Sequence, residues 1–165
     1  MRRGQAMVET VLAVIFITFV FLGLFQVSQL LSARIMLDHA AARAARAKAV
    51  GFNDFMCLKT ARVAMLPVAG RRLWPQDERV DEASRVPIYL CTDNEAIARG
   101  VLEYDRWHDL DFSVRSGMGI SPVAESEVRM GVRNLLSRDE ESTFGMSGAS
   151  EMESHFPYYM QDQGL

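Results

Sequence analysis

The sequence has few of the side chains from which metal and redox sites are built. Its 165 residues include only two cysteines and three histidines. His39, His108 and His155 lie far apart, and no Cys or His spacing matches a zinc site. Several aspartates surround His108, but a solvated turn explains this group as well as a metal site does. We therefore expect no metal and no cofactor.

The sequence also lacks the motifs of common catalytic sites. The glycine-rich stretches at 116–119 and 145–148 are not followed by the Lys and Ser/Thr of a phosphate-binding loop. Ser147 does not stand in the pattern of a nucleophile elbow. The net charge of −3 argues against nucleic acid as a main partner, because nucleic-acid-binding proteins usually carry a basic excess. We expect neither an enzyme nor a nucleic-acid-binding protein.

Formal charge is missing from one long and mostly apolar stretch, residues 10–33. As a helix, about 24 residues extend roughly 36 Å, which exceeds the hydrocarbon core of a bilayer at about 30 Å. A cleaved secretory signal fits less well, since its apolar core has only about 7 to 15 residues. The stretch predicts one membrane-spanning helix, surrounded by the lipid bilayer.

The helix should continue beyond the membrane. Residues 34–50 are rich in alanine and arginine and contain neither glycine nor proline, and Gly51 is the first residue suited to end a helix. We expect one helix over residues 5–50, in which a stem extends the apolar span. The small side chains of the stem allow close packing against another helix, whereas a solvated alanine-rich stalk is the alternative. These side chains are Ala40, Ala41, Ala42, Ala44, Ala45, Ala47 and Ala49.

Residues 51–137 have the length and pattern of one small α+β head. Asn53 or Asp54 can cap a helix that Pro67 would end, and a capping-box pattern at 92–95 predicts another helix. Apolar residues alternate in a way that predicts three strands. The three segments are 86–90, 110–114 and 128–132.

The two ends of the chain differ in charge. Residues 1–4 form a short basic leader, whereas residues 138–165 form an acidic tail rich in glycine and serine, which we expect to be disordered. An aromatic cluster at 155–160 either docks on the head or forms a contact motif. The chain is thus divided into a leader, a helix with its stem, a head and a tail.

Cys57 and Cys91 bear on the compartment of the head. An even number of cysteines beyond a membrane span suits a disulfide in an oxidising compartment, while two separate thiols are an equally good interpretation. The basic stem argues the other way, since the positive-inside rule would place the head in the cytoplasm. Arg43, Arg46 and Lys48 lie roughly 15 Å or more beyond the span, where that rule weakens. We expect the head outside the cytoplasm.

Glu9 is the most unusual residue near the span. It stands directly before the apolar run, where a carboxylate is costly to bury, and such residues are candidates for function. The alternative is a carboxylate at headgroup level that remains hydrated, which depth alone favours.

The residues before and after the span form a larger pattern. It consists of Arg2-Arg3-Gly4, then Gln5-Ala6-Met7-Val8-Glu9-Thr10, the apolar run and the Ala/Arg-rich stem. This segment resembles a TadE-like protein, a pilin-like component of tight-adherence (Flp-type) pilus systems. The wider class of type IV pilins shares a short basic leader that ends in Gly, with Glu as the fifth residue after it. Gly4 and Glu9 have this relation here.

The resemblance implies how the segment is processed and used. A prepilin peptidase would cleave after Gly4 and leave Gln5 as the new N-terminus, and Glu9 would pair with the terminal amine of a neighbouring subunit or recruit the protein to an assembly site. The helix would pack against other pilin-like subunits and engage the pilus assembly machinery, with the protein in the inner membrane. The alternative is an unprocessed, single-pass anchored binding module that holds a partner with its head.

Overall fold

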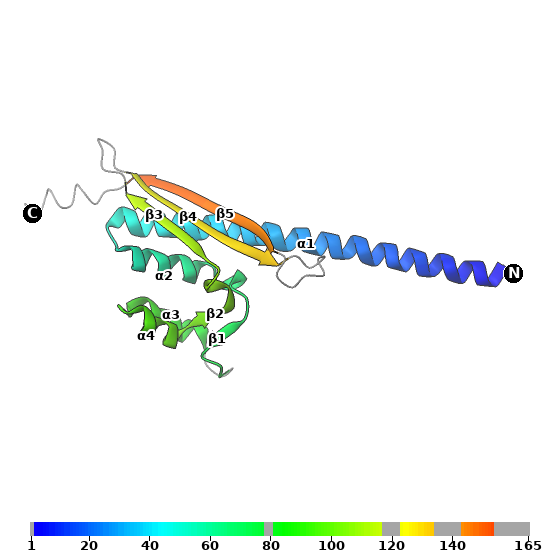
Figure 1. Cartoon of the computed structure of the whole chain (residues 1–165), viewed down its shortest axis with the longest axis horizontal. Coiled ribbons are helices and arrows are strands. Elements are labelled where there is room, and N and C mark those ends of the chain that lie inside the picture. Colours follow the sequence, from blue (N-terminus) through cyan, green and yellow to red (C-terminus); the bar gives the residue numbers. More distant parts are fainter. Residues whose placement is uncertain (1, 78–80, 117–122, 134–142, 154–165) are drawn as a thin grey trace, which may run out of the picture.

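The computed structural model describes residues 2–77, 81–116, 123–133 and 143–153. Helices and a sheet form a head around one end of a long helix, so the fold is α+β as expected (Figure 1). The elements in chain order are α1 (Arg2–Val50), α2 (Asp54–Ala64), η1 (Leu66–Val68), β1 (Arg72–Trp74), α3 (Glu82–Cys91), α4 (Glu95–Val101), β2 (Glu103–Tyr104), η2 (Asp105–Trp107), β3 (Asp111–Ser116), β4 (Val123–Arg133) and β5 (Thr143–Glu153).

The long helix α1 ends where its sequence predicts. Gly51 has φ of 99°, a left-handed conformation that glycine adopts without steric penalty. Its N–H donates to the Lys48 carbonyl at 2.9 Å, and the Phe52 N–H donates to the Ala47 carbonyl at 3.1 Å. This is the hydrogen-bond pattern of a Schellman motif, so the expected helix stop at Gly51 is confirmed.

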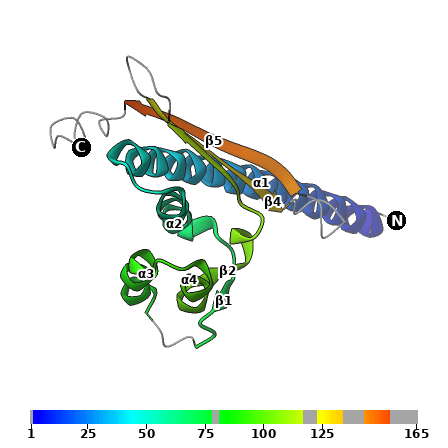
Figure 2. The same cartoon turned by 60° about the vertical axis from the view of Figure 1, so that its left-hand side comes forward.

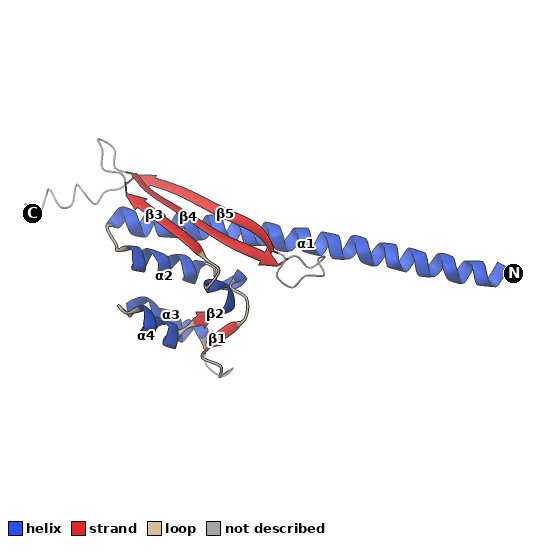
Figure 3. Ribbon diagram, in the orientation of Figure 1, coloured by secondary structure: helices blue, strands red, loops and turns tan. Residues whose placement is uncertain are grey.

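The second half of α1 is packed between a sheet and α2. The sheet has strand order β3-β4-β5 with antiparallel pairing, and it lies along one side of α1 (Figures 1 and 3). The buried side chains of β4 alternate, as expected for a strand with one face on a core. They are Ala124, Ser126, Val128, Met130 and Val132.

The stem alanines are the surface on which this packing occurs. Ala40, Ala41 and Ala44 are fully buried and form one core with Leu37 and residues of α2 and β4. The close helix contact expected from these alanines is therefore present, and the partner helix is α2 of the same chain. Most of the stem alanines are thus covered by the chain's own head.

The remaining elements form an outer layer beyond α2 (Figure 2). Here α3 and α4 pack with the short β1-β2 pair around a second core. Its buried residues are Ala69, Tyr89, Ala98, Leu102, Tyr104 and Trp107.

Several local expectations are confirmed. The Asn53 side chain accepts a hydrogen bond from the Met56 N–H at 2.8 Å and caps α2, as predicted. The two later alternating segments are strands β3 and β4. Helix α4 is capped by Asn94 instead of Thr92, and it ends at Val101.

The strand expected at 86–90 is wrong, because this segment belongs to helix α3. Tyr89 is buried and Val86 and Leu90 are half-buried, whereas Ile88 is 51% exposed. Val86 and Leu90 are four residues apart and share one helix face, so the apparent alternation was part of a helical period. Asp81 starts the helix by accepting a hydrogen bond from the Ala83 N–H at 3.1 Å.

The expected disorder of the whole tail is also wrong. Strand β5 pairs with β4 without a register shift from Thr143↔Arg133 to Glu153↔Val123. Glycine and serine suggested disorder, yet small side chains are what the close packing of β5 on α1 requires. The aromatic cluster at 155–160 lies outside the described residues.

Candidate functional site

The apolar half of α1 is the first candidate site. In Figure 1 it extends away from the head, and none of its most apolar 18-residue window is buried by the rest of the described chain. Large side chains such as Phe16 and Phe21 are more than 60% exposed. Their exposure to water would be unfavourable by about 25 cal/mol per Å² of apolar surface. Length and composition make this helix able to cross a membrane.

The two threonine hydroxyls within this half are satisfied by the helix itself. The Thr10 hydroxyl donates to the Ala6 carbonyl at 2.9 Å, and the Thr18 hydroxyl donates to the Val14 carbonyl at 2.8 Å. Such bonds let a hydroxyl face lipid without an unpaired donor. The helix therefore presents a nearly uniform apolar surface to its surroundings.

Glu9 lies at the far end of this surface. Its side chain is exposed, and within the described part of the chain its carboxylate makes no hydrogen bond or ion pair. Gly4 and Gln5 lie in the first turns of α1, so the peptide bond between them is inside the helix. All three residues are far from the head in the chain's own fold (Figure 1). Glu9 therefore has no role in stabilising the head.

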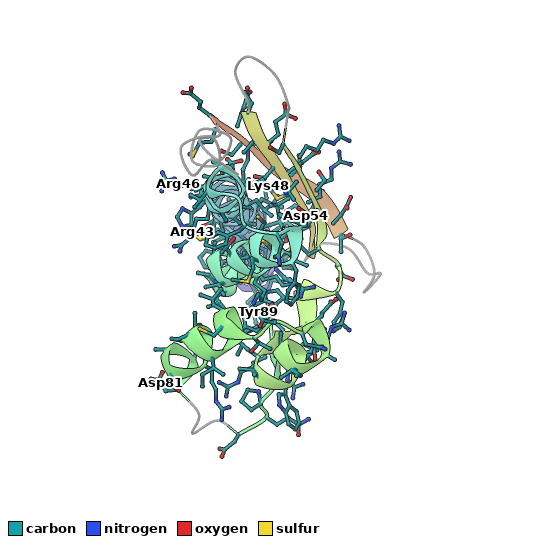
Figure 4. The ribbon with its side chains drawn as sticks, turned by 90° about the vertical axis from the view of Figure 1, so that its left-hand side faces the viewer. Arg43, Arg46, Lys48, Asp54, Asp81 and Tyr89 are labelled. Carbon is teal, nitrogen blue, oxygen red and sulfur yellow. The ribbon has the colours of Figure 1, made fainter. Side chains whose placement is uncertain are left out.

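The basic residues of the stem divide into two groups. Arg43 and Arg46 are exposed and point away from the sheet (Figure 4). Lys48 instead pairs with Asp54 at 2.7 Å, which links the end of α1 to the start of α2. Arg43 and Arg46 thus form an exposed basic surface on the stem.

Cys57 and Cys91 are free thiols in the structure, which is the second of the two alternatives that the sequence left open. Cys57 is fully buried beside the end of α1, and its Sγ lies 3.7 Å from the Phe52 carbonyl oxygen. Cys91 is exposed at the end of α3, in the outer layer. Burial raises the pKa of the Cys57 thiol. The cysteines therefore give no support for an oxidising compartment.

Lys59 is an important residue that the sequence did not reveal. It is fully buried, and its Nζ donates to the Leu90 carbonyl at 2.6 Å and to the Thr92 carbonyl at 2.5 Å. It also lies 4.8 Å from the centre of the Phe55 ring, and burial lowers its pKa. Carbonyls at a helix end lack intrahelical donors, so Lys59 satisfies the end of α3 and joins the outer layer to α2.

An aromatic cluster forms the centre of the outer layer. The Trp107 ring centroid lies 5.3 Å from that of Tyr89 and 4.9 Å from that of Tyr104. Trp107 is therefore a core residue of the outer layer. His108 pairs with Glu103 at 3.0 Å, and within the described ranges no group of three His, Cys, Asp or Glu side chains could hold a metal.

Comparison with known proteins concerns α1 alone. Residues 4–46 match the family model described as TadE-like protein. No curated protein and no solved structure matches the chain. The match begins at Gly4, includes Glu9 and the apolar span, and ends in the stem, so the head lies outside it. The resemblance carried by the N-terminal residues is confirmed, and the chain is similar to the TadE-like family over residues 4–46.

Proposed function

We propose that the protein is a membrane-anchored, pilin-like structural or assembly component of a tight-adherence or type IV-like pilus or secretion system. The observation that carries this proposal is the state of α1. None of its most apolar segment is buried by the rest of the described chain. The family match includes this segment and continues into the stem. An apolar helix surface that its own chain does not cover can contact lipid before assembly and pack against neighbouring helices after assembly. This role is structural and needs no catalytic step.

Glu9 and Gly4 have defined roles in this proposal. A prepilin peptidase cleaves after Gly4, and the new amine of Gln5 becomes a cation at the end of the helix. Burial of a lone carboxylate in an apolar interface costs free energy, and an adjacent ammonium group offsets much of that cost. Glu9 of one subunit therefore pairs with the Gln5 amine of a neighbour. The absence of any partner for Glu9 within the described chain supports this assignment.

The head lies outside the cytoplasm in this proposal, with α1 in the inner membrane. The positive-inside rule alone would favour the opposite side, because the stem is basic. However, Arg43 and Arg46 lie roughly 15 Å or more beyond Ala33 along α1, where that rule weakens. The unpaired cysteines supply no further argument.

Mass and N-terminal sequence of the protein purified from its native membrane test the proposal. A chain that begins at Gln5 shows that a prepilin peptidase has acted. A chain that still begins at Met1 or Arg2 contradicts the processed, pilin-like role.

The second candidate is an unprocessed anchored binding module. An exposed apolar pair on β1 favours it, since Leu73 is 36% and Trp74 is 47% exposed. Under this alternative the native protein keeps its leader, and truncation of Trp74 to alanine lowers partner binding without affecting the membrane anchor.

A further inference from the structure

A hollow opens between α1 and the head at the point where the two separate. Its volume is about 340 Å³. One wall is polar and comes from α1, through Ser28, Gln29 and Ser32. The opposite wall comes from the head, through η1, Gly70 and Arg106. The hollow thus joins a helix segment next to the span with a cation of the head.

The position of this hollow along α1 coincides with a membrane surface. A hydrocarbon core of about 30 Å takes up roughly 20 helical residues. Counted from Thr10, the first residue of the uncharged run, this length ends near Gln29. Ser28, Gln29 and Ser32 therefore lie where the hydrocarbon gives way to lipid headgroups on the head side.

Arg106 is fixed at the wall of the hollow. Its Nη1 donates to the Val68 carbonyl at 3.2 Å. The side chain also lies against Gly70, where an added Cβ would come 3.3 Å from the Arg106 Cγ. Gly70 has φ of 82°, so both its conformation and its lack of a side chain favour glycine. This bond uses one of the five N–H donors of the guanidinium, and within the described ranges the other four are left for other acceptors.

The hollow differs in charge from two other large hollows of the described chain. Both of those lie on the outer face of the sheet and are lined by carboxylates, which include Glu127 in each case. Among the residues that the structure describes, none with a carboxylate lines the hollow at Arg106. Hydroxyl, amide and guanidinium donors together match the oxygens of a phosphate group.

We propose that this hollow binds the phosphate of an anionic phospholipid headgroup from the head-side leaflet. Arg106 supplies the charge, and Ser28, Gln29 and Ser32 supply hydrogen bonds from α1. Such a lipid would be held by α1 and the head together, so it would fix the tilt of the head on the membrane. The proposal rests on α1 as a membrane span and does not depend on cleavage after Gly4.

Native mass spectrometry of the full-length protein in detergent tests the site. The protein is titrated with phosphatidylglycerol and with phosphatidylcholine of the same acyl chains. We expect phosphatidylglycerol to bind more tightly. Arg106→Gln should weaken its binding on the order of tenfold, because it removes the charge-assisted hydrogen bonds to the phosphate. The matched control is Arg71→Gln, because Arg71 is exposed and does not line the hollow.

A second variant separates lipid binding from damage to the head. Ser32→Leu fills the hollow from α1 and leaves Arg106 and its bond to Val68 intact, so it should weaken phosphatidylglycerol binding as well. Three results would overturn the proposal. Arg106→Gln and Ser32→Leu could both bind as the wild type does, or Arg71→Gln could weaken binding equally. Glycerol phosphate could also bind as tightly as the lipid, which would assign the hollow to a soluble phosphate ester.

Discussion

Gly148 of β5 lies directly on the backbone of Leu37 in α1. A Cβ at position 148 would overlap the Leu37 carbonyl group and lie 2.6 Å from the Asp38 nitrogen. The obstacle is helix backbone, which cannot move aside as a flexible side chain can. Opposite Gly148 on β4 lies Val128, which is fully buried in the same core. The lack of a side chain at 148 thus sets how closely the sheet approaches the stem.

Gly148→Ala should therefore destabilise the head. Overpacking of a core typically lowers the free energy of unfolding by about 1 to 3 kcal/mol, and the backbone contact places this variant toward the upper end. Thermal unfolding of the full-length protein in detergent, followed by circular dichroism, measures the change. Gly145→Ala is the matched control on the same strand, because nothing lies within 4 Å of an added Cβ there. Equal melting temperatures for the two variants would contradict this account of β5.

Lys59→Met should weaken the contact between α2 and the outer layer. The substitution leaves the Leu90 and Thr92 carbonyls without their buried donor, which costs about 1 to 3 kcal/mol for unsatisfied groups. Lys48→Met is the control, since it removes the ion pair with the exposed Asp54, and exposed pairs contribute only about 0 to 1 kcal/mol. Hydrogen exchange of α3 gives the local readout. Unchanged protection of α3 in Lys59→Met would contradict a capping role.

Much of the fold could be predicted because its signals are local. The uncharged run, the alanine stem and Gly51 define α1, and sustained alternation defines β3 and β4. Helix α3 was missed because an alternating segment of five residues also fits one turn of a helix. Strand β5 was missed because its order comes from pairing with β4 and from contact with α1, which are distant in sequence.

The candidate site shows the same division between local and distant signals. Glu9, Gly4 and the span belong to one continuous segment, so the sequence showed them together. Lys59 and Arg106 gain their roles from the Leu90 and Val68 carbonyls, each more than 30 residues away. No local pattern marks such contacts.

The two thiols should react very differently with iodoacetamide. Cys91 is exposed, whereas Cys57 is buried and its pKa is raised from the ordinary 9.0. We expect rapid alkylation of Cys91 at pH 8, and alkylation of Cys57 only after unfolding, as measured by mass spectrometry of peptides. A change in electrophoretic mobility on reduction would instead show a disulfide and contradict the assignment of free thiols.

The raised pKa of Cys57 also fixes the sign of a pH effect on stability. Above pH 9 the unfolded chain loses the Cys57 proton while the folded chain retains it. The folded state then binds more protons, so stability falls as pH rises from 9 toward the raised pKa. Denaturant unfolding at pH 8 and pH 10 should show a larger loss in the wild type than in Cys57→Ala. An equal loss in both would exclude the thiol as the cause.

Glu9→Ala should separate assembly from folding. Glu9 is exposed and has no partner within the described chain, so the melting temperature of the head should not change. If Glu9 pairs with the Gln5 amine of a neighbour, the substitution leaves that ammonium unpaired in an apolar interface, which is costly. Incorporation of the variant into filaments, or its processing after Gly4, should then fall sharply in the native host. Asp38→Ala is the control, because it removes an exposed carboxylate from the stem that lies 4.0 Å from Arg34. A Glu9→Ala variant that assembles as the wild type does would assign Glu9 to the hydrated headgroup level and remove it from the proposed subunit contact.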